Sequence, residues 1–107
     1  LVAALIGSAE ELFFRGFLQN MVKNINALFS ILFSSISHTA YKCFLFMAPE
    51  VSGNINLKLL FLWTFGVGLL FGTIRHYSKS IIVPLFAHAV FDILVYAEYF
   101  NPPWWVW

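Results

Sequence analysis

The stretch SAEELFFRG, from Ser8 to Gly16, places three charged residues inside an otherwise apolar segment. It is preceded by LVAALIG and followed by FLQNMV, so no wet face of an amphipathic helix accommodates these charges. A charged side chain in an apolar segment is costly unless it is paired or faces a polar interior. The stretch therefore indicates a polar site inside a bundle of apolar helices.

The composition of the whole chain is that of a membrane protein. Of its 107 residues, 61% are hydrophobic and only 10% are charged. Soluble domains carry about 25% charged residues, so this chain cannot cover a water-facing surface. The net charge of +1 and the scattered basic residues exclude a nucleic-acid-binding surface. The single Cys43 excludes an intrachain disulfide framework.

Four segments are long enough to cross the hydrocarbon core of a bilayer, which takes about 20 helical residues. We predict an all-α membrane protein, a bundle of four transmembrane helices in a multi-pass protein of the cell membrane. Because the chain begins within an apolar run and without Met, we interpret 1–107 as the core of a longer protein whose N-terminal helices are missing. The predicted helices cover residues 1–22, 25–48, 57–74 and 80–100.

The third segment and the connections give further expectations. Gly68 and Gly72 form a small-xxx-small face, which predicts a close approach of another helix. Lys23, Arg75 and Lys79 fall in the first and third predicted connections. The positive-inside rule therefore places these two connections in the cytoplasm.

Ionisable residues lie near the middle of three of the four predicted helices, far from the ends where side chains can snorkel. Antiparallel helices bring these positions to about the same depth, and each costly polar group should face the interior of the bundle. We therefore predict that Glu10, His38 and His88 converge on one polar cavity. Glu11 and Asp92 lie at the same depth.

Two helical pairs follow from the spacing. Glu11 precedes Arg15 by four residues, the favoured orientation for an ion pair. Glu10 is rotated by about 100° from Glu11, so we expect it to remain unpaired and able to act as a base. His88 and Asp92 are also four residues apart. Buried Glu–Arg pairs and lone histidines also join membrane helices without chemistry, but the shared depth favours a site.

These motifs resemble the CPBP family of intramembrane proteases, which includes the CAAX prenyl endopeptidases and the bacterial abortive-infection membrane proteins. EELFFR matches the family's Glu-Glu-x-x-x-Arg signature, HAVFD matches its His-x-x-x-Asn/Asp motif, and His38 stands where its middle histidine belongs. Two positions depart from the family pattern. Ser34 replaces the usual Phe four residues before His38, and Asp92 replaces the Asn that is usual in the prenyl proteases.

The resemblance implies an intramembrane endopeptidase that hydrolyses a peptide bond of a membrane-associated or prenylated peptide or protein. Glu10, helped by His38, activates a water molecule, and His88 with Asp92 stabilises the oxyanion. The expected partners are that substrate and the lipid bilayer, and not nucleic acid. The expected catalytic set is Glu10, Glu11, Arg15, His38, His88 and Asp92.

Metal dependence stays open at this point, since two His, a Glu and an Asp could bind zinc and family members have been labelled metalloproteases. No HExxH motif is present, and the Glu11–Arg15 pair compensates charge without a cation. We therefore favour a mechanism without metal or other cofactor. If a metal is bound, its expected ligands are Glu10, His38, His88 and Asp92.

Two other functions are compatible with a polar core in a membrane bundle. One is a catalytically silent member of the same family, acting in bacteriocin immunity or protein binding. The other is a proton or ion relay in a transporter, which predicts discontinuous helices or inverted repeats. The four segments show no internal symmetry, which disfavours the transporter.

Overall fold

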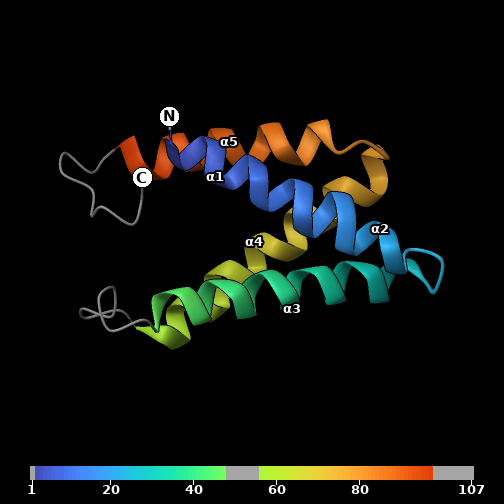
Figure 1. Ribbon diagram of the computed structural model, residues 1–107, viewed down its shortest axis with the longest axis horizontal. Helices are drawn as coiled ribbons and strands as arrows, with labels where there is room; N and C mark the ends of the chain where they lie inside the picture. The colour runs from blue at the N-terminus through green and yellow to red at the C-terminus, as the bar shows by residue number, and fades with distance from the viewer. Residues whose placement is uncertain (1, 48–55, 98–107) are drawn as a thin grey trace.

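The computed structural model describes residues 2–47 and 56–97, and over these residues the chain is helical apart from short turns (Figure 1). The all-α prediction is therefore confirmed for the described part of the chain. The elements are α1 (Val2–Glu11), the π-helix η1 (Leu12–Leu18), α2 (Gln19–Val22), α3 (Ala27–Phe46), α4 (Leu57–Ser78) and α5 (Ile82–Ala97).

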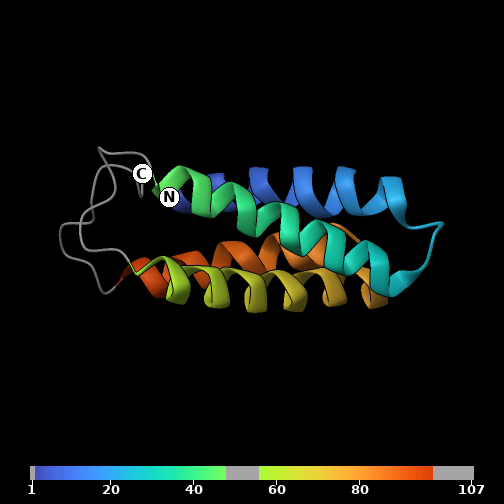
Figure 2. The same cartoon turned by 90° about the horizontal axis from the view of Figure 1, so that it is seen from below.

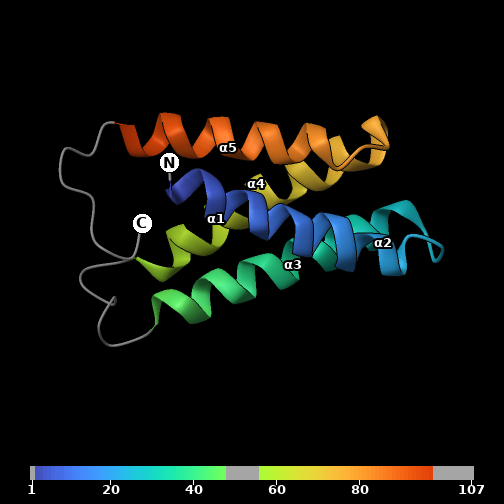
Figure 3. The ribbon, with the colours of Figure 1, turned by 45° about the horizontal axis from the view of Figure 1, so that its top comes forward.

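These elements form an elongated antiparallel bundle measuring 41 × 24 × 17 Å. The segments α1, η1 and α2 follow one another as a single helical rod, and α3 returns alongside it (Figures 1 and 2). The closest packing joins α3 to α4 and α1 to α5 (Figure 3). The first and third connections lie at one end of the bundle, and the N-terminus of the chain lies at the other.

The helix ends differ from the predicted boundaries at two connections. Asn26 caps α3 by accepting a hydrogen bond from the Phe29 backbone N–H at 2.6 Å, so this helix begins after residue 26. Residues 75–78, predicted as part of a connection, instead form the last turn of α4. Basic side chains such as Arg75 are favourable at a helix C-terminus. The helix ends at Lys79, whose backbone is left-handed with φ 54°.

The bundle buries polar side chains and exposes apolar ones, the reverse of a soluble protein. Among the described residues, the buried hydrophobic side chains are Ala3, Phe14 and Phe71. Large apolar side chains such as Leu5 and Phe44 are exposed, at 63% and 80%. The buried polar residues are Glu10, Glu11, Arg15, Gln19, Ser30, Ser34, Ser35, His38, Thr39, His88 and Asp92.

By length and composition, α4 is the one helix of the described residues that is long and apolar enough to cross a membrane, while α5 is apolar but shorter. The first rod is divided into α1, η1 and α2, of which the longest has 10 residues, and α3 carries five buried polar side chains. The prediction of four crossing helices therefore stays a prediction.

The predicted close approach at the α4 glycines is confirmed. A Cβ atom on Gly68 would lie 3.2 Å from the Cβ of Ser35, and one on Gly72 would lie 3.1 Å from Cγ2 of Ile31. Both distances are shorter than ordinary van der Waals contact, so α3 packs on α4 as closely as the absence of side chains there allows.

Candidate functional site

Glu10 lies in the last turn of α1 and points into the bundle, where it is 6% exposed. Its Oε2 is 3.2 Å from Nε2 of His38, and its Oε1 is 2.5 Å from Nζ of Lys42, both on α3. The expectation that Glu10 is unpaired was therefore wrong. Lys42 follows His38 by four residues and so shares its helix face, which is the signal that could have revealed it.

Glu11 is fully buried and holds two partners through one oxygen. Its Oε1 is 2.9 Å from NH1 of Arg15 and 2.9 Å from Nδ1 of His88. The predicted Glu11–Arg15 pair is thus present in the structure. The same carboxylate also ties the first helical rod to α5, so it joins two segments that are distant in the sequence.

Arg15 lies within η1 and connects the first rod to α4. Its guanidinium is fully buried, and NH2 donates a hydrogen bond to the Gly68 carbonyl at 3.2 Å. One turn further, Nε2 of Gln19 donates to the Gly72 carbonyl at 2.9 Å. The side chains of Arg15 and Gln19 can reach these two carbonyls because Gly68 and Gly72 have no side chains that would obstruct them.

The π-helix η1 determines how these side chains are oriented. Its i→i+5 hydrogen bonds place more residues in each turn than an α-helix does, which changes the faces of the residues that follow Glu11. Phe14 and Arg15 are the buried residues of this segment, and both border the polar site. Short π segments occur frequently at functional sites, in agreement with this placement.

His88 is held between carboxylates and an aromatic ring. Its Nδ1 faces Glu11, and its Nε2 is 3.5 Å from Oδ1 of Asp92. The Phe71 ring lies with its centroid 4.8 Å from that of the imidazole. The i,i+4 spacing on α5 therefore directs both His88 and Asp92 into the bundle, toward the first rod.

Gly7 is a site residue that the sequence did not reveal. A Cβ atom there would lie 3.1 Å from Cδ2 and 3.3 Å from Nε2 of His88, and it would collide with the carboxylate of Asp92. The absence of a side chain is therefore what lets α5 place these groups against α1. The spacing was a usable signal, because Gly7 precedes Glu10 and Glu11 by one helical turn.

All of the predicted site residues lie in one buried cluster. The His38 and His88 rings face each other edge to face with their centroids 6.1 Å apart, which links the Glu10 side of the cluster to the Glu11 side. Glu10, His38 and His88 therefore converge in the interior of the bundle, as predicted. The two glutamates have separate partners, with His38 and Lys42 on one and Arg15 and His88 on the other.

The predicted metal ligand Glu10 and its neighbour Glu11 are each paired with a cation. In residues 2–47 and 56–97, no three or more His, Cys, Asp or Glu side chains are arranged to hold a metal ion. The Lys42 ammonium lies on Glu10, and the Arg15 guanidinium lies on Glu11. Each cation occupies an oxygen that a metal would need and repels a second positive charge.

An apolar cavity of about 320 Å³ adjoins Glu10 on the outer side of the bundle. Its walls are apolar or aromatic, and the side chains of Phe13 and Tyr41 at its edge are about half exposed. The cavity therefore connects the buried carboxylate to the apolar exterior. It is lined by Ile6, Ala9, Glu10, Phe13, Phe14 and Tyr41.

Comparison with known proteins agrees with this arrangement. The sequence model of a family described as type II CAAX prenyl endopeptidase Rce1-like matches residues 1–94. No curated protein and no solved structure matches the chain. The matched region covers α1 and the part of α5 that carries His88 and Asp92, so it includes the whole polar cluster. The chain therefore belongs to the type II CAAX prenyl endopeptidase Rce1-like family.

Proposed function

We propose that this protein is an intramembrane endopeptidase that hydrolyses a peptide bond of a membrane-associated or prenylated peptide or protein. The observation that carries the proposal is the position of Glu10. It lies beside His38 at 3.2 Å, and it also borders an apolar cavity that opens on the outside of the bundle. A carboxylate with a histidine partner and a route for an apolar substrate is the arrangement that hydrolysis at a membrane requires.

The substrate class follows from the walls of the cavity next to Glu10. Aromatic side chains such as Phe13 and Tyr41 can hold an apolar peptide segment or an isoprenoid chain. Apolar chains reach this cavity from the exterior of the bundle, where large hydrophobic side chains are exposed. A membrane-associated substrate can therefore reach Glu10 from the lipid.

In the proposed reaction, Glu10 takes a proton from a water molecule while His38 holds the carboxylate in place. The water oxygen forms a bond to the peptide carbonyl carbon, and the carbonyl oxygen becomes an oxyanion. The C–N bond then breaks, and Glu10 returns the proton to the leaving amine. One water molecule is consumed, and a carboxylic acid and an amine are formed, between which a proton passes to give a carboxylate and an ammonium group.

We assign stabilisation of the oxyanion to His88, whose ring centroid lies 6.1 Å from that of His38. Its Nδ1 is held by Glu11 at 2.9 Å, which orients the ring and leaves Nε2, 3.5 Å from Oδ1 of Asp92, as the donor to the oxyanion. A donor positioned before the reaction stabilises the charge that develops in the transition state. Arg15 keeps Glu11 in place for this role.

We further propose that the reaction needs no metal ion. The support is that Lys42 and Arg15 already neutralise the two glutamates. We expect a zinc chelator to leave the cleavage rate of the full-length protein unchanged. Loss of cleavage with the chelator, restored by added zinc, would contradict this part of the proposal and leave the peptidase in place.

We also propose that all four helical segments cross the bilayer, which makes the protein a multi-pass protein of the cell membrane. The support is the apolar exterior of the first rod, α3, α4 and α5 around a polar interior. Lipid-exposed charges are costly, and the charged side chains of the cluster avoid lipid by facing inward.

The decisive assay is cleavage of quenched fluorescent peptides by the purified full-length protein in proteoliposomes. One peptide carries a prenylated cysteine near its C-terminus, and a matched peptide carries the unmodified cysteine. We expect cleavage, with faster turnover of the prenylated peptide because its apolar chain fits the cavity beside Glu10. Binding without any cleavage would instead favour the catalytically silent member of the family.

Gly7→Ala should reduce turnover strongly while the bundle still folds. The added methyl group overlaps the Asp92 carboxylate and presses on the His88 ring, so both side chains must move from their places in the site. Displacement of a catalytic group by about 1 Å can lower the rate about 100-fold. Gly66→Ala is the matched control, because a Cβ there meets nothing within 4 Å. Equal turnover of the two variants would show that the Gly7 contact does not position the site.

A further inference from the structure

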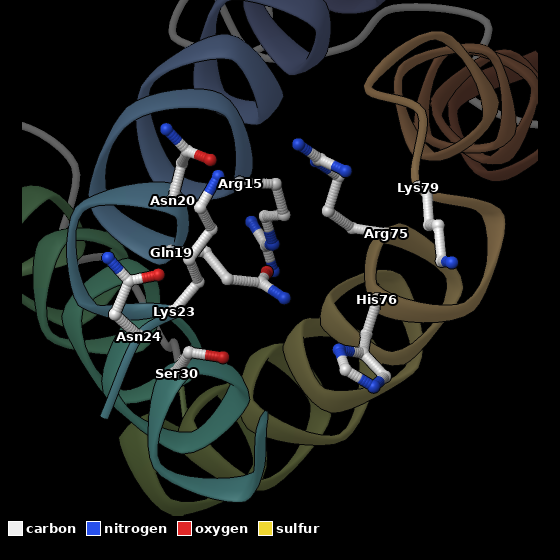
Figure 4. A pocket seen from close by; sticks show the side chains of 9 residues that line it. All are labelled: Arg15, Gln19, Asn20, Lys23, Asn24, Ser30, Arg75, His76 and Lys79. Carbon is white, nitrogen blue, oxygen red and sulfur yellow. The ribbon is translucent and has the colours of Figure 1, made fainter. Parts of the chain in front are cut away.

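A second cavity, of about 450 Å³, lies at the end of the bundle where the first and third connections meet (Figure 4). It is separate from the apolar cavity beside Glu10, and its lining is polar. Its walls come from η1, α2, the start of α3 and the last turn of α4. Five of its lining residues are basic, namely Arg15, Lys23, Arg75, His76 and Lys79.

The inner part of this end pocket holds two guanidinium groups with free hydrogen-bond donors. Arg15 is fully buried, and its Nε has no hydrogen-bond partner among the described residues. The same holds for the buried Nε of Arg75. In Figure 4 the Arg75 guanidinium points across the opening toward the side of Arg15. Buried donors of this kind are normally paired, so these two indicate a ligand.

Apart from the charge of Arg15, the positive charges of the end pocket have no carboxylate partner among the described residues. No Asp or Glu lines it, and within the described residues Lys23, Arg75 and Lys79 form no ion pair. Glu11 compensates Arg15 from the side of the polar cluster. The remaining cations repel one another unless an anion lies between them.

Lys79 gives an independent indication that its side chain has a role. It occupies the left-handed position that ends α4, where φ is 54°. Glycine is the residue favoured at such a position, because it lacks the Cβ that makes this conformation costly. A lysine at a strained position beside a basic cavity fits a function for its charge.

We propose that the end pocket binds a phosphate group, either the headgroup of an anionic phospholipid or free phosphate. Guanidinium groups match the geometry of phosphate oxygens, and lysines add charge at the rim. The pocket lies at the end that the positive-inside rule assigns to the cytoplasm. Basic pockets between helices on that side are suited to anionic headgroups. This inference does not depend on peptide cleavage.

The test uses the full-length protein in a neutral detergent and measures thermal stability and binding affinity. The probes are inorganic phosphate, a short-chain phosphatidylglycerol, and the matched short-chain phosphatidylcholine as the zwitterionic control. We expect the phosphatidylglycerol to raise the Tm of the wild type more than the phosphatidylcholine does. If inorganic phosphate raises the Tm by a similar amount, the free anion is a ligand of the pocket. If only the phosphatidylglycerol raises the Tm, the ligand is the lipid headgroup.

Arg75→Gln should weaken binding of the anion about tenfold or more, because a charge-assisted hydrogen bond is lost. Lys58→Gln is the matched control, since Lys58 begins the same helix at the opposite end and is exposed. Equal affinities of these two variants, or no stabilisation of the wild type by either anion, would overturn the proposal.

Lys79→Gly separates a ligand-binding role from a structural one and does not rely on Arg75. Glycine relieves the left-handed backbone, so we expect the Tm of the ligand-free protein to rise. The loss of the ammonium should at the same time weaken anion binding several-fold. A higher Tm with unchanged anion affinity would show that Lys79 is not part of the site and would contradict the proposal.

Discussion

Glu10→Gln should abolish peptide cleavage while the protein remains folded. The amide keeps the shape of the side chain and can still bond to Nε2 of His38, but it cannot accept the proton of the attacking water. Removal of a general base lowers the rate by about 100- to 10,000-fold. The measurement is turnover of the prenylated quenched peptide by full-length wild type and variant, with circular dichroism to compare their helicity.

The paired control for Glu10→Gln concerns Lys42. The amide leaves this ammonium without a counter-charge, so the single variant changes both the base and the local charge. Lys42→Met removes the cation and keeps the base, and we expect it to retain substantial turnover. If Glu10→Gln still cleaves the peptide at the wild-type rate, Glu10 is not the base and the mechanism fails.

Glu11→Gln should destabilise the protein by about 3–5 kcal/mol, because it leaves a buried guanidinium without its carboxylate. Arg15 and Glu11 are both fully buried, so bulk water hydrates the unpaired guanidinium poorly. The same change weakens the bond to Nδ1 of His88, which ties the first rod to α5. The measurement is the unfolding midpoint in detergent, and we expect lower Tm together with lower turnover.

A double variant distinguishes charge compensation from a general loss of packing. Replacing a buried ion pair by apolar residues of similar volume is often neutral, whereas removing one partner is not. Glu11→Leu/Arg15→Met should therefore be more stable than Glu11→Gln, while turnover stays low because His88 has lost its partner. A double variant less stable than the single one would contradict the assignment of Glu11 as a structural partner of Arg15.

The polar cluster could be predicted from the sequence because two local rules apply to it. Spacing of four residues on a helix predicted the contact between Glu11 and Arg15 and the shared face of His88 and Asp92. Glu10 and His38 both lie near the middle of antiparallel helices, and this shared depth predicted that they lie close together. Both rules use only the period of a helix and the cost of exposing a charge to lipid.

The remaining features depend on how the helices pack against one another. Lys42 could have been placed on the His38 face, but its contact with Glu10 depends on the crossing of α3 and the first rod. The need for a glycine at position 7 follows from the close approach of His88 and Asp92 of α5 to its backbone. The π-helix η1 has no sequence signature that we could use, so the bond from Arg15 to the Gly68 carbonyl could not be derived from the sequence.

The polar interior also determines how the protein should respond to temperature. A positive heat-capacity change on unfolding arises mainly from apolar surface that becomes exposed to water. Here most large apolar side chains already lie on the outside of the folded bundle, and unfolding within a lipid or detergent phase releases polar groups from one another. We therefore expect a heat-capacity change well below that of a soluble domain of this length. The free energy of unfolding should then vary almost linearly with temperature, without the low-temperature decline that leads to cold denaturation.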